Sequence, residues 1–216
     1  MAAVEAIAAV APYESFLTRS VEAVADDLES FARLLAKWNR VQNLVSRETL
    51  SAVWTRHVAD SLQLLRLLDD AHVILDLGSG GGFPALPLAV ALKGSDVTFL
   101  LVEPNARKVS FLRTVARELG LAVSVEGRRA EAIDSRETAP PDVITARAVT
   151  PLAPLLTLAQ PFFGPNTRAL FHKGREHVDE LLESAALWQH DVVIHRSDTD
   201  PSGVLLEISN LRLRNS

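Results

Sequence analysis

The chain has 216 residues, of which 48% are hydrophobic, and it carries a formal net charge of −5. This length supports one sizeable core with a modest extension, so we expect a single globular unit. Cysteine is absent, which excludes disulfides, thiolate metal sites and cysteine nucleophiles. The negative net charge excludes a protein that coats nucleic acid by bulk positive charge, so any such contact must be a local basic patch.

The sequence contains no sign of membrane insertion or secretion. No apolar stretch approaches the roughly 18 residues of a membrane span. Residues 1–11 are rich in alanine but contain Glu5 and no basic segment, unlike a secretory signal. We therefore expect a cytoplasmic protein with no membrane contact.

The first seventy residues are predicted to be helical. Apolar residues recur at steps of three and four across 21–41, as on one face of an amphipathic helix, and Ser20 can cap its start. The segment 39–46 breaks this rhythm, and Ser46 can open a second helix that runs to about residue 68. We expect residues 1–70 to form an extension packed on a main domain of residues 71–216.

Short apolar runs alternate with helical stretches in the rest of the chain. The runs lie at 73–77, 98–102, 121–125, 142–146, 168–172, 191–195 and 203–208. This alternation predicts an α/β fold with a mostly parallel sheet and helices on both faces. The last two runs are joined by a connection too short for a crossover helix, so they should pair as an antiparallel hairpin. Seven strands ending in a hairpin is the Rossmann-like arrangement of class I methyltransferases.

A glycine-rich turn follows the first apolar run. Gly78, Gly80 and Gly82 let the backbone reverse tightly and let a ligand lie against bare peptide groups. A dinucleotide fingerprint G-x-G-x-x-G would need a third glycine at position 83, where Phe83 stands and Pro84 follows. This departure favours S-adenosylmethionine over NAD, with Phe83 forming a wall beside the adenosine or the methyl group.

Two acidic positions follow the next strands. Glu103 ends the second predicted strand, about 20 to 25 residues beyond the turn, where an acid can accept hydrogen bonds from both ribose hydroxyls. The alternative is a strand-end acid on a solvated loop. Ala130 and Glu131 lie in the loop after the third strand, where this fold usually holds the adenine edge, and a solvated charged loop is the alternative there. No metal site is predicted.

Three basic side chains are further candidates for the site. Arg147 ends the fourth run, where open α/β sheets bind ligands, and either contacts the cofactor carboxylate or an RNA phosphate or pairs with a local carboxylate. His57 neighbours Asp60 on the second predicted helix, where it lines the roof of a cleft or is a satisfied structural group. Lys173 follows the fifth run, in a basic lip with Arg147 or among solvated charges.

Seven short motifs occur in order between Trp38 and Gly174. They are Trp-Asn-x-x-x-Asn-Leu at 38–44, Arg-His-x-x-Asp-Ser-Leu at 56–62, the glycine turn ending in Phe83-Pro84, Arg-Lys-x-x-Phe-Leu at 107–112, Ala130-Glu131, Ala-Arg-Ala at 146–148 and His-Lys-Gly at 172–174. Together they resemble the bacterial 16S ribosomal RNA guanine-N7 methyltransferase family, also called glucose-inhibited division protein B.

The resemblance implies S-adenosylmethionine as the cofactor and a guanine of small-subunit ribosomal RNA as the substrate. We expect the methyltransferase domain to cover residues 71–216. The resemblance also implies cofactor contacts from the turn, the ribose acid, the adenosine loop and the fourth strand: Gly78, Phe83, Glu103, Ala130, Glu131 and Arg147. The glycine turn itself adds Gly80 to the expected cofactor-binding residues. Two positions depart from the family pattern. Val45 replaces the usual threonine of Asn-Leu-Thr, which leaves an RNA contact open, and Glu103 replaces the commoner aspartate.

Guanine N7 carries no proton at neutral pH, so methyl transfer to it requires no base. The rate enhancement comes from alignment of the reacting atoms, which can lower the activation barrier by up to roughly 7 to 11 kcal/mol. We therefore predict no catalytic acid or base, and name as positioning candidates Arg147, His57 and Lys173. Because A-form RNA buries N7, the guanine must be unpaired or flipped, and the candidates to stack on it are Phe83, Trp54 and Phe171.

Two other readings stay open at this point. One is a class I methyltransferase acting on a small molecule, an exocyclic amine or another RNA site, although the Asn-Pro-Pro-Tyr type of motif is missing after Ile144. The other is a non-catalytic ribosome-assembly factor that binds the cofactor, against which the intact Gly78 and Glu103 argue. We expect a monomer, because no extended apolar seam is left unassigned. The sequence does not distinguish naked RNA from an assembled subunit as substrate.

Overall fold

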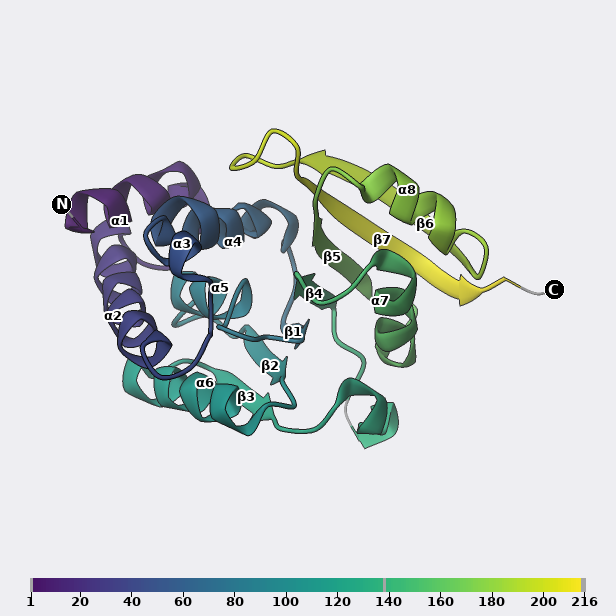
Figure 1. The fold of residues 1–216 in the computed structure, drawn as a ribbon, viewed down its shortest axis with the longest axis horizontal. Helices are drawn as coiled ribbons and strands as arrows, with labels where there is room; N and C mark the ends of the chain where they lie inside the picture. The colour runs from purple at the N-terminus through teal and green to yellow at the C-terminus, as the bar shows by residue number, and fades with distance from the viewer. Residues whose placement is uncertain (1, 138, 215–216) are drawn as a thin grey trace.

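The computed structural model describes residues 2–137 and 139–214 and has a seven-stranded sheet at its centre (Figure 1). The strands are β1 Val73–Leu77, β2 Thr98–Val102, β3 Val123–Glu126, β4 Val143–Arg147, β5 Arg168–Lys173, β6 Trp188–Arg196 and β7 Val204–Leu213. Their order across the sheet is β3-β2-β1-β4-β5-β7-β6. Strand β7 runs antiparallel to both β5 and β6, and the other pairings are parallel. The predicted sheet and its terminal hairpin are confirmed.

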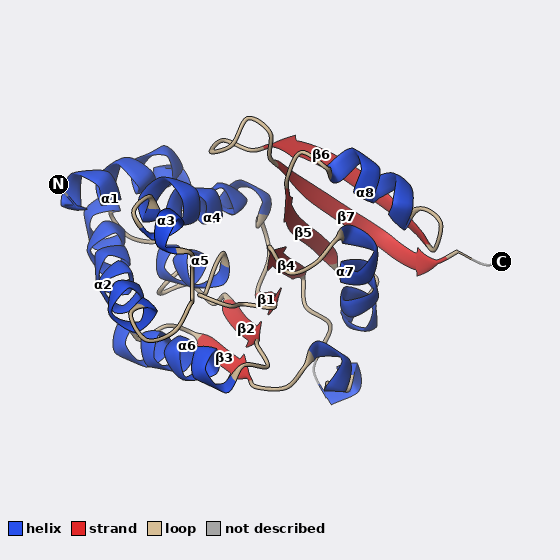
Figure 2. Ribbon diagram, in the orientation of Figure 1, coloured by secondary structure: helices blue, strands red, loops and turns tan. Residues whose placement is uncertain are grey.

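Helices cover both faces of this sheet. Those that follow the first strand are α5 Ala85–Ala91, α6 Ala106–Leu119, α7 Leu152–Ala159 and α8 His177–Ser184. Successive residues of β1 face opposite sides. Ile74 belongs to a core shared with α2, α5 and α6, whereas Leu75 belongs to a second core built around α7. Figure 2 shows α7 and α8 on the side of the sheet away from α2 and α6.

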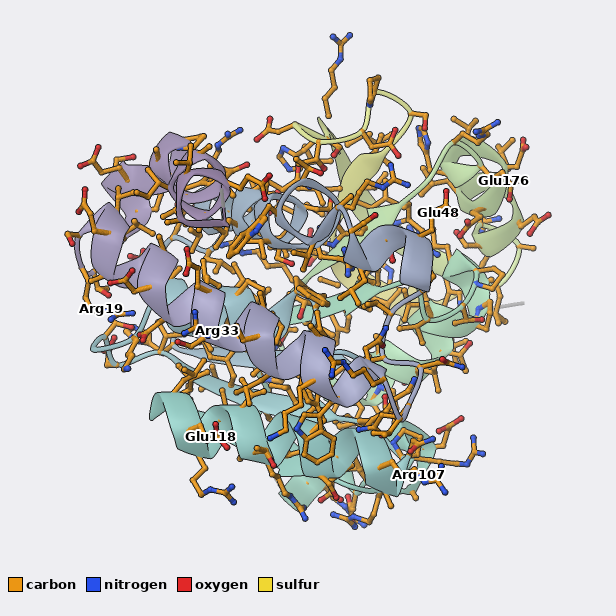
Figure 3. The ribbon with its side chains drawn as sticks, turned by 60° about the vertical axis from the view of Figure 1, so that its left-hand side comes forward. Arg19, Arg33, Glu48, Arg107, Glu118 and Glu176 are labelled. Atoms are coloured by element: carbon orange, nitrogen blue, oxygen red, sulfur yellow. The ribbon has the colours of Figure 1, made fainter. Side chains whose placement is uncertain are left out.

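The N-terminal residues are helical, as predicted. They begin with α1 Ala2–Val10 and a short turn of helix at Ala11–Phe16, followed by α2 Val21–Asn39. The Ser20 hydroxyl accepts a hydrogen bond from the Ala23 amide at 3.3 Å, which confirms the predicted cap. Helix α2 lies across α6 (Figure 3), and the rings of Phe31 and Phe111 lie 6.4 Å apart between them. The extension therefore shares one hydrophobic core with the sheet.

The second predicted helix is wrong as a single continuous element. The chain forms α3 Arg47–Leu50, a wider π-helical turn at Trp54–Ala59, α4 Asp60–Leu62 and a 3₁₀ turn at Gln63–Leu67. Three side chains form hydrogen bonds with backbone carbonyls of this segment. Arg147 donates to the carbonyl of Arg56, and Ser61 donates to the carbonyl of His57. The ring of His172 is hydrogen-bonded to the carbonyl of Asp60. Side chains inserted into the ladder interrupt a helix in this way.

Strand ends differ from the prediction by a few residues. Strand β3 begins at Val123 and not at residue 121, because the Leu121 amide still donates to the Ala116 carbonyl at the end of α6. Strand β6 begins at Trp188 because pairing with β7 continues as far as Leu213. Among the described residues, no helix is long and apolar enough to span a bilayer.

Candidate active site

A cavity of about 550 Å³ opens at the carboxyl ends of β1, β4 and β5. Open α/β sheets place their ligands at this edge. The glycine turn after β1, the helical segment around residues 54–60 and the β6–β7 loop at 197–203 contribute to its walls. Six of the predicted site residues line it: Gly78, Gly80, Phe83, His57, Arg147 and Lys173. Three others do not line it, namely Glu103, Ala130 and Glu131.

The glycine turn has a backbone that side chains would disturb. Gly78 has φ +67°, and a Cβ placed on it would lie 2.8 Å from a methyl group of Val149. The fold itself therefore requires glycine at this position. Gly80 has φ +54°, but a Cβ there would meet, beyond its chain neighbours, no atom of the described residues nearer than the Gly78 carbonyl oxygen at 3.7 Å. The space beside Gly80 is therefore open to a ligand that approaches the bare peptide.

Glu103 holds the glycine turn in place. One carboxylate oxygen accepts a hydrogen bond from the Gly80 amide at 2.9 Å, and the other accepts one from the Asn105 amide at 2.9 Å. The side chain is only 5% exposed, which excludes a solvated strand-end acid. Each oxygen can accept a further hydrogen bond. Sequence spacing indicated the closeness of Glu103 to the turn but not this structural role.

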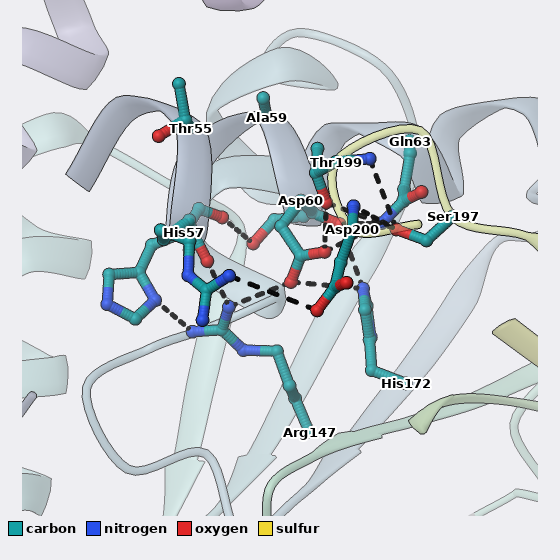
Figure 4. Close-up of polar contacts among 12 residues, drawn as sticks. Thr55, His57, Ala59, Asp60, Gln63, Arg147, His172, Ser197, Thr199 and Asp200 are labelled. Atoms are coloured by element: carbon teal, nitrogen blue, oxygen red, sulfur yellow. Dashed lines mark hydrogen bonds and ion pairs between the residues drawn. The ribbon is translucent and has the colours of Figure 1, made fainter. Parts of the chain in front are cut away.

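Arg147 forms an ion pair inside the cavity (Figure 4). One terminal nitrogen of its guanidinium donates to Asp60 Oδ2 at 3.0 Å and to the Arg56 carbonyl at 3.0 Å. The central carbon of this guanidinium lies 4.9 Å from the centroid of the Phe83 ring. The local carboxylate foreseen as the alternative partner is thus Asp60. This pair keeps the cation at the end of β4 while leaving it in the cavity wall.

His57 is fixed as a neutral ring beside this pair. The other terminal nitrogen of Arg147 lies 2.7 Å from His57 Nδ1, and because a guanidinium only donates, Nδ1 is the acceptor and the ring proton is on Nε2. Burial, together with the charge of Arg147, lowers the pKa of His57 to about 4. The ring stacks on Phe83 at 4.7 Å between centroids. His57 therefore has no free lone pair with which to act as a base.

Asp60 connects the helical segment to the β6–β7 loop. Its Oδ1 accepts hydrogen bonds from Thr199 Oγ1 at 2.7 Å and from Gln63 Nε2 at 2.9 Å (Figure 4). Its backbone carbonyl accepts one from His172 Nε2 at 2.9 Å, and burial lowers the pKa of that imidazole. No sequence pattern pointed to Thr199, because that residue lies in an ordinary turn between two predicted strands.

Lys173 and Asp76 are buried polar groups at the same edge. Lys173 Nζ donates to Glu180 at 2.6 Å and to the Thr150 carbonyl at 2.8 Å, so it is neither a free basic lip nor a solvated charge. Asp76 accepts a hydrogen bond from Thr145 at 2.7 Å, and burial raises the pKa of its carboxyl to about 7. These contacts join the ends of β1, β4 and β5 to one another and to α8.

Some predicted residues lie elsewhere. Ala130 and Glu131 form a short 3₁₀ turn after β3, and Glu131 is exposed. Phe171 has no exposed surface and belongs to the core around α7, so its candidacy as a base-stacking residue is wrong. Its position on β5 points it into that core, as the period of two on a strand requires. Trp54 is 9% exposed and Phe83 is 4% exposed, and Phe83 also lines the cavity.

Solved structures share this architecture. An O-methyltransferase from Bacillus cereus in complex with SAH aligns with a TM-score of 0.59 and 16% identity, covering 86% of this chain and 91% of that one. A SAM dependent methyltransferase from Aquifex aeolicus aligns with a TM-score of 0.56 and 14% identity, covering 81% and 97%. The sheet order is that of the class I S-adenosylmethionine-dependent methyltransferase fold, and the cavity lies at the carboxyl edge of this sheet.

Sequence comparison identifies the family. Residues 24–200 match the GidB family, described as rRNA small subunit methyltransferase G. Relatives named ribosomal RNA small subunit methyltransferase G from Brucella ovis and from Brucella suis biovar 1 are each 44% identical over 190 residues, covering 87% of this chain and 88% of theirs. The chain belongs to the rRNA small subunit methyltransferase G family.

Proposed function

We propose that this protein transfers the methyl group of S-adenosylmethionine to N7 of a specific guanine in 16S ribosomal RNA. Family membership supports a small-subunit RNA substrate. The structural observation that carries the proposal is the contact between Glu103 and the Gly80 amide, because it holds a bare peptide turn beside a cavity at the carboxyl edge of the sheet.

The residues around the turn fit this cofactor. The space beside Gly80 is open, and His57 Nε2 is a buried donor without a partner among the described residues. We infer that the turn and the acid hold the methionine and ribose parts, the loop after β3 holds adenosine and the end of β4 completes the site, through Gly78, Gly80, Phe83, Glu103, Ala130, Glu131 and Arg147. When bound, the cofactor supplies an electrophilic methyl group on a sulfonium.

The side chains of the cavity position the reactants and do not transfer protons. N7 of guanine is an unprotonated lone pair, and the lone pair of His57 is already engaged by Arg147. His57 and Arg147 lie 2.7 Å apart and both pack on the ring of Phe83, which fixes one wall of the cavity. Lys173 fixes the loop that follows Arg147 through the Thr150 carbonyl. Holding nitrogen, carbon and sulfur in line contributes up to roughly 7 to 11 kcal/mol.

The substrate guanine must leave its helix to reach the cavity, because A-form RNA buries N7 in a deep groove. With Phe171 excluded, Phe83 and Trp54 remain the aromatic candidates beside it. We further propose that the protein acts in the cytoplasm as a monomer, with residues 1–70 as the extension and residues 71–216 as the methyltransferase domain.

Methyl transfer to purified ribosomal subunits tests the proposal. Small subunits from cells lacking this protein and from cells containing it would be incubated with labelled S-adenosylmethionine and the purified enzyme. We expect label only in subunits from the deficient cells, in 16S RNA, as 7-methylguanine. Tight cofactor binding without transfer to either preparation would favour the assembly-factor alternative, and transfer to naked 16S RNA as well would show that assembly is not required.

A further inference from the structure

A second groove, of about 380 Å³, lies beside the cavity between the end of α2 and the start of α6. We call it the basic groove, because three cations line it together with amide side chains: Arg40, Arg107, Lys108, Asn39, Asn43 and Asn105. No carboxylate of a described residue lines it. Lys108 lines both the basic groove and the cavity, so the two spaces are neighbours.

Within the part of the chain that the structure describes, the cations of the basic groove have no internal partner. Among the described residues, no carboxylate forms an ion pair with Arg40, Arg107 or Lys108, whereas Arg147 and Lys173 in the cavity are both paired. Arg107 and Lys108 occupy the first turn of α6, which has no acidic residue. The helix dipole disfavours cations at that end. These cations therefore gain no stabilising ion pair within the described chain, and their arrangement favours the binding of an anionic ligand.

One wall of the basic groove is fixed by Asn39. Its side-chain oxygen accepts hydrogen bonds from the amides of Leu44 at 2.8 Å and Val45 at 3.1 Å, and its amide nitrogen donates to the Val45 carbonyl at 3.1 Å. These bonds order the segment that carries Arg40. They reach only the backbone of residue 45, so valine in place of the family's threonine leaves them intact.

The other wall is fixed to the glycine turn. Asn105 caps α6 by accepting hydrogen bonds from the amides of Arg107 at 3.0 Å and Lys108 at 3.3 Å. The Asn105 amide itself donates to Glu103, whose other oxygen binds the Gly80 amide. The cations at the start of α6 are therefore held at a set position relative to the turn at which we place the cofactor.

We propose that the basic groove binds backbone phosphates of the RNA strand whose guanine enters the cavity. This inference rests on the proposed function, which supplies a polyanion next to the cavity. Phosphates neutralised by arginine and lysine give binding that weakens with salt, and neutral amides add hydrogen bonds to phosphate or sugar. A local patch of this kind also reconciles RNA binding with the net charge of −5.

Charge removal on α2 and α6 tests the proposal. The double variant Arg40→Gln, Arg107→Gln removes two cations of the basic groove. The control Arg33→Gln, Arg117→Gln removes two exposed cations from the same pair of helices, outside the groove. The affinity of each protein for unmethylated small subunits would be measured across a salt series. Cofactor affinity would be measured in parallel by calorimetry, and folding by thermal melting.

We expect the groove variant to lose about tenfold or more in RNA affinity and about two units in the slope of log affinity against log salt. Adding Lys108→Gln should lower the slope by about one more unit. The control should match the wild type, and cofactor affinity should be unchanged in both double variants. Equal losses in the groove variant and the control would overturn the groove while leaving the methyltransferase assignment standing. A wild-type protein that neither binds nor methylates small subunits would overturn both.

Discussion

Thr199 of the β6–β7 loop donates a hydrogen bond of 2.7 Å to Asp60, a residue 139 positions earlier in the N-terminal helical segment. The same carboxylate accepts the hydrogen bond of Arg147 at 3.0 Å through its second oxygen. One carboxylate thus holds the hairpin loop and the cation at the end of β4 in a common network (Figure 4). The cavity is closed on this side by segments from the two ends of the chain.

The Thr199→Val variant should loosen this closure. It removes one donor to Asp60 while Gln63 and Arg147 remain bonded to that carboxylate. A hydrogen bond to a charged group is worth about 1.5 to 3 kcal/mol, and we expect about 1 to 2 kcal/mol of lost stability in urea unfolding. Thr157→Val, at an exposed position on α7, is the matched control. A variant as stable as that control would show that the loop contact contributes nothing.

Removing both members of the Arg147–Asp60 pair should cost less than the sum of the two single removals. Arg147→Ala leaves Asp60 and the Nδ1 atom of His57 without their cationic partner in a largely buried place. We expect about 2 to 4 kcal/mol of lost stability for each single variant, Arg147→Ala and Asp60→Ala, because the remaining charge is uncompensated. The double variant should lose less than the sum of the two. Additive losses in the double-mutant cycle would rule out coupling.

Glu103→Gln should weaken cofactor binding. Its amide nitrogen would face a backbone amide of either Gly80 or Asn105, so one of the two present hydrogen bonds must be lost. We expect at least about a tenfold lower affinity for S-adenosylmethionine by calorimetry, which is about 1.4 kcal/mol. Glu118→Gln, exposed on α6, is the control (Figure 3). Equal affinities in the two variants would remove Glu103 from the site.

Substitution of the two key glycines should separate folding from binding. Gly78→Asp should destabilise the fold as well as the site, because its Cβ would lie 2.8 Å from Val149. Gly80→Asn should fold, since asparagine tolerates positive φ and the surrounding space is open. That variant should still melt cooperatively but bind the cofactor poorly in calorimetry. Full affinity of Gly80→Asn would contradict a cofactor lying against this peptide.

His57 gives a pH dependence of known sign. Its pKa is lowered from 6.5 to about 4 in the folded protein, so the unfolded chain binds more protons between these values. The stabilising effect of a neutral ring is complete above about pH 6.5 and is lost as the pH falls toward 4. Urea unfolding at several pH values should show that the free energy of unfolding declines less steeply with falling pH in His57→Gln than in the wild type. The pH profile of methyl transfer by this variant should keep every titration step of the wild type near neutral pH. An unchanged decline would mean that His57 titrates normally.

Local patterns predicted much of this fold. The apolar period and Ser20 gave α2, the alternating apolar runs gave the sheet, and the short connection before β7 gave the hairpin. The interrupted helix at residues 47–67 escaped prediction, because its cause lies in Arg147 and His172, on strands more than 80 residues away. A tertiary hydrogen bond of that kind leaves no periodic signal in the segment it distorts.

In the site, too, local patterns predicted some features, whereas features that depend on tertiary contacts could not be predicted. Glycine spacing and the acid after β2 placed Gly80 and Glu103 together, because the carboxyl ends of adjacent parallel strands meet at one edge. The partner of Arg147 could only be called a local carboxylate, since Asp60 reaches it through tertiary packing. The burial of Lys173 against Glu180 was likewise hidden, because a basic residue at a strand end reads the same whether it is solvated or paired.

The most direct test of the central claim is mass mapping of 16S RNA from cells that lack this protein, with and without complementation. We predict the loss of a single 7-methylguanine in the deficient strain, its return with the wild-type gene, and a diminished return with Glu103→Gln. A 16S RNA whose methyl marks are identical in all strains would contradict the account.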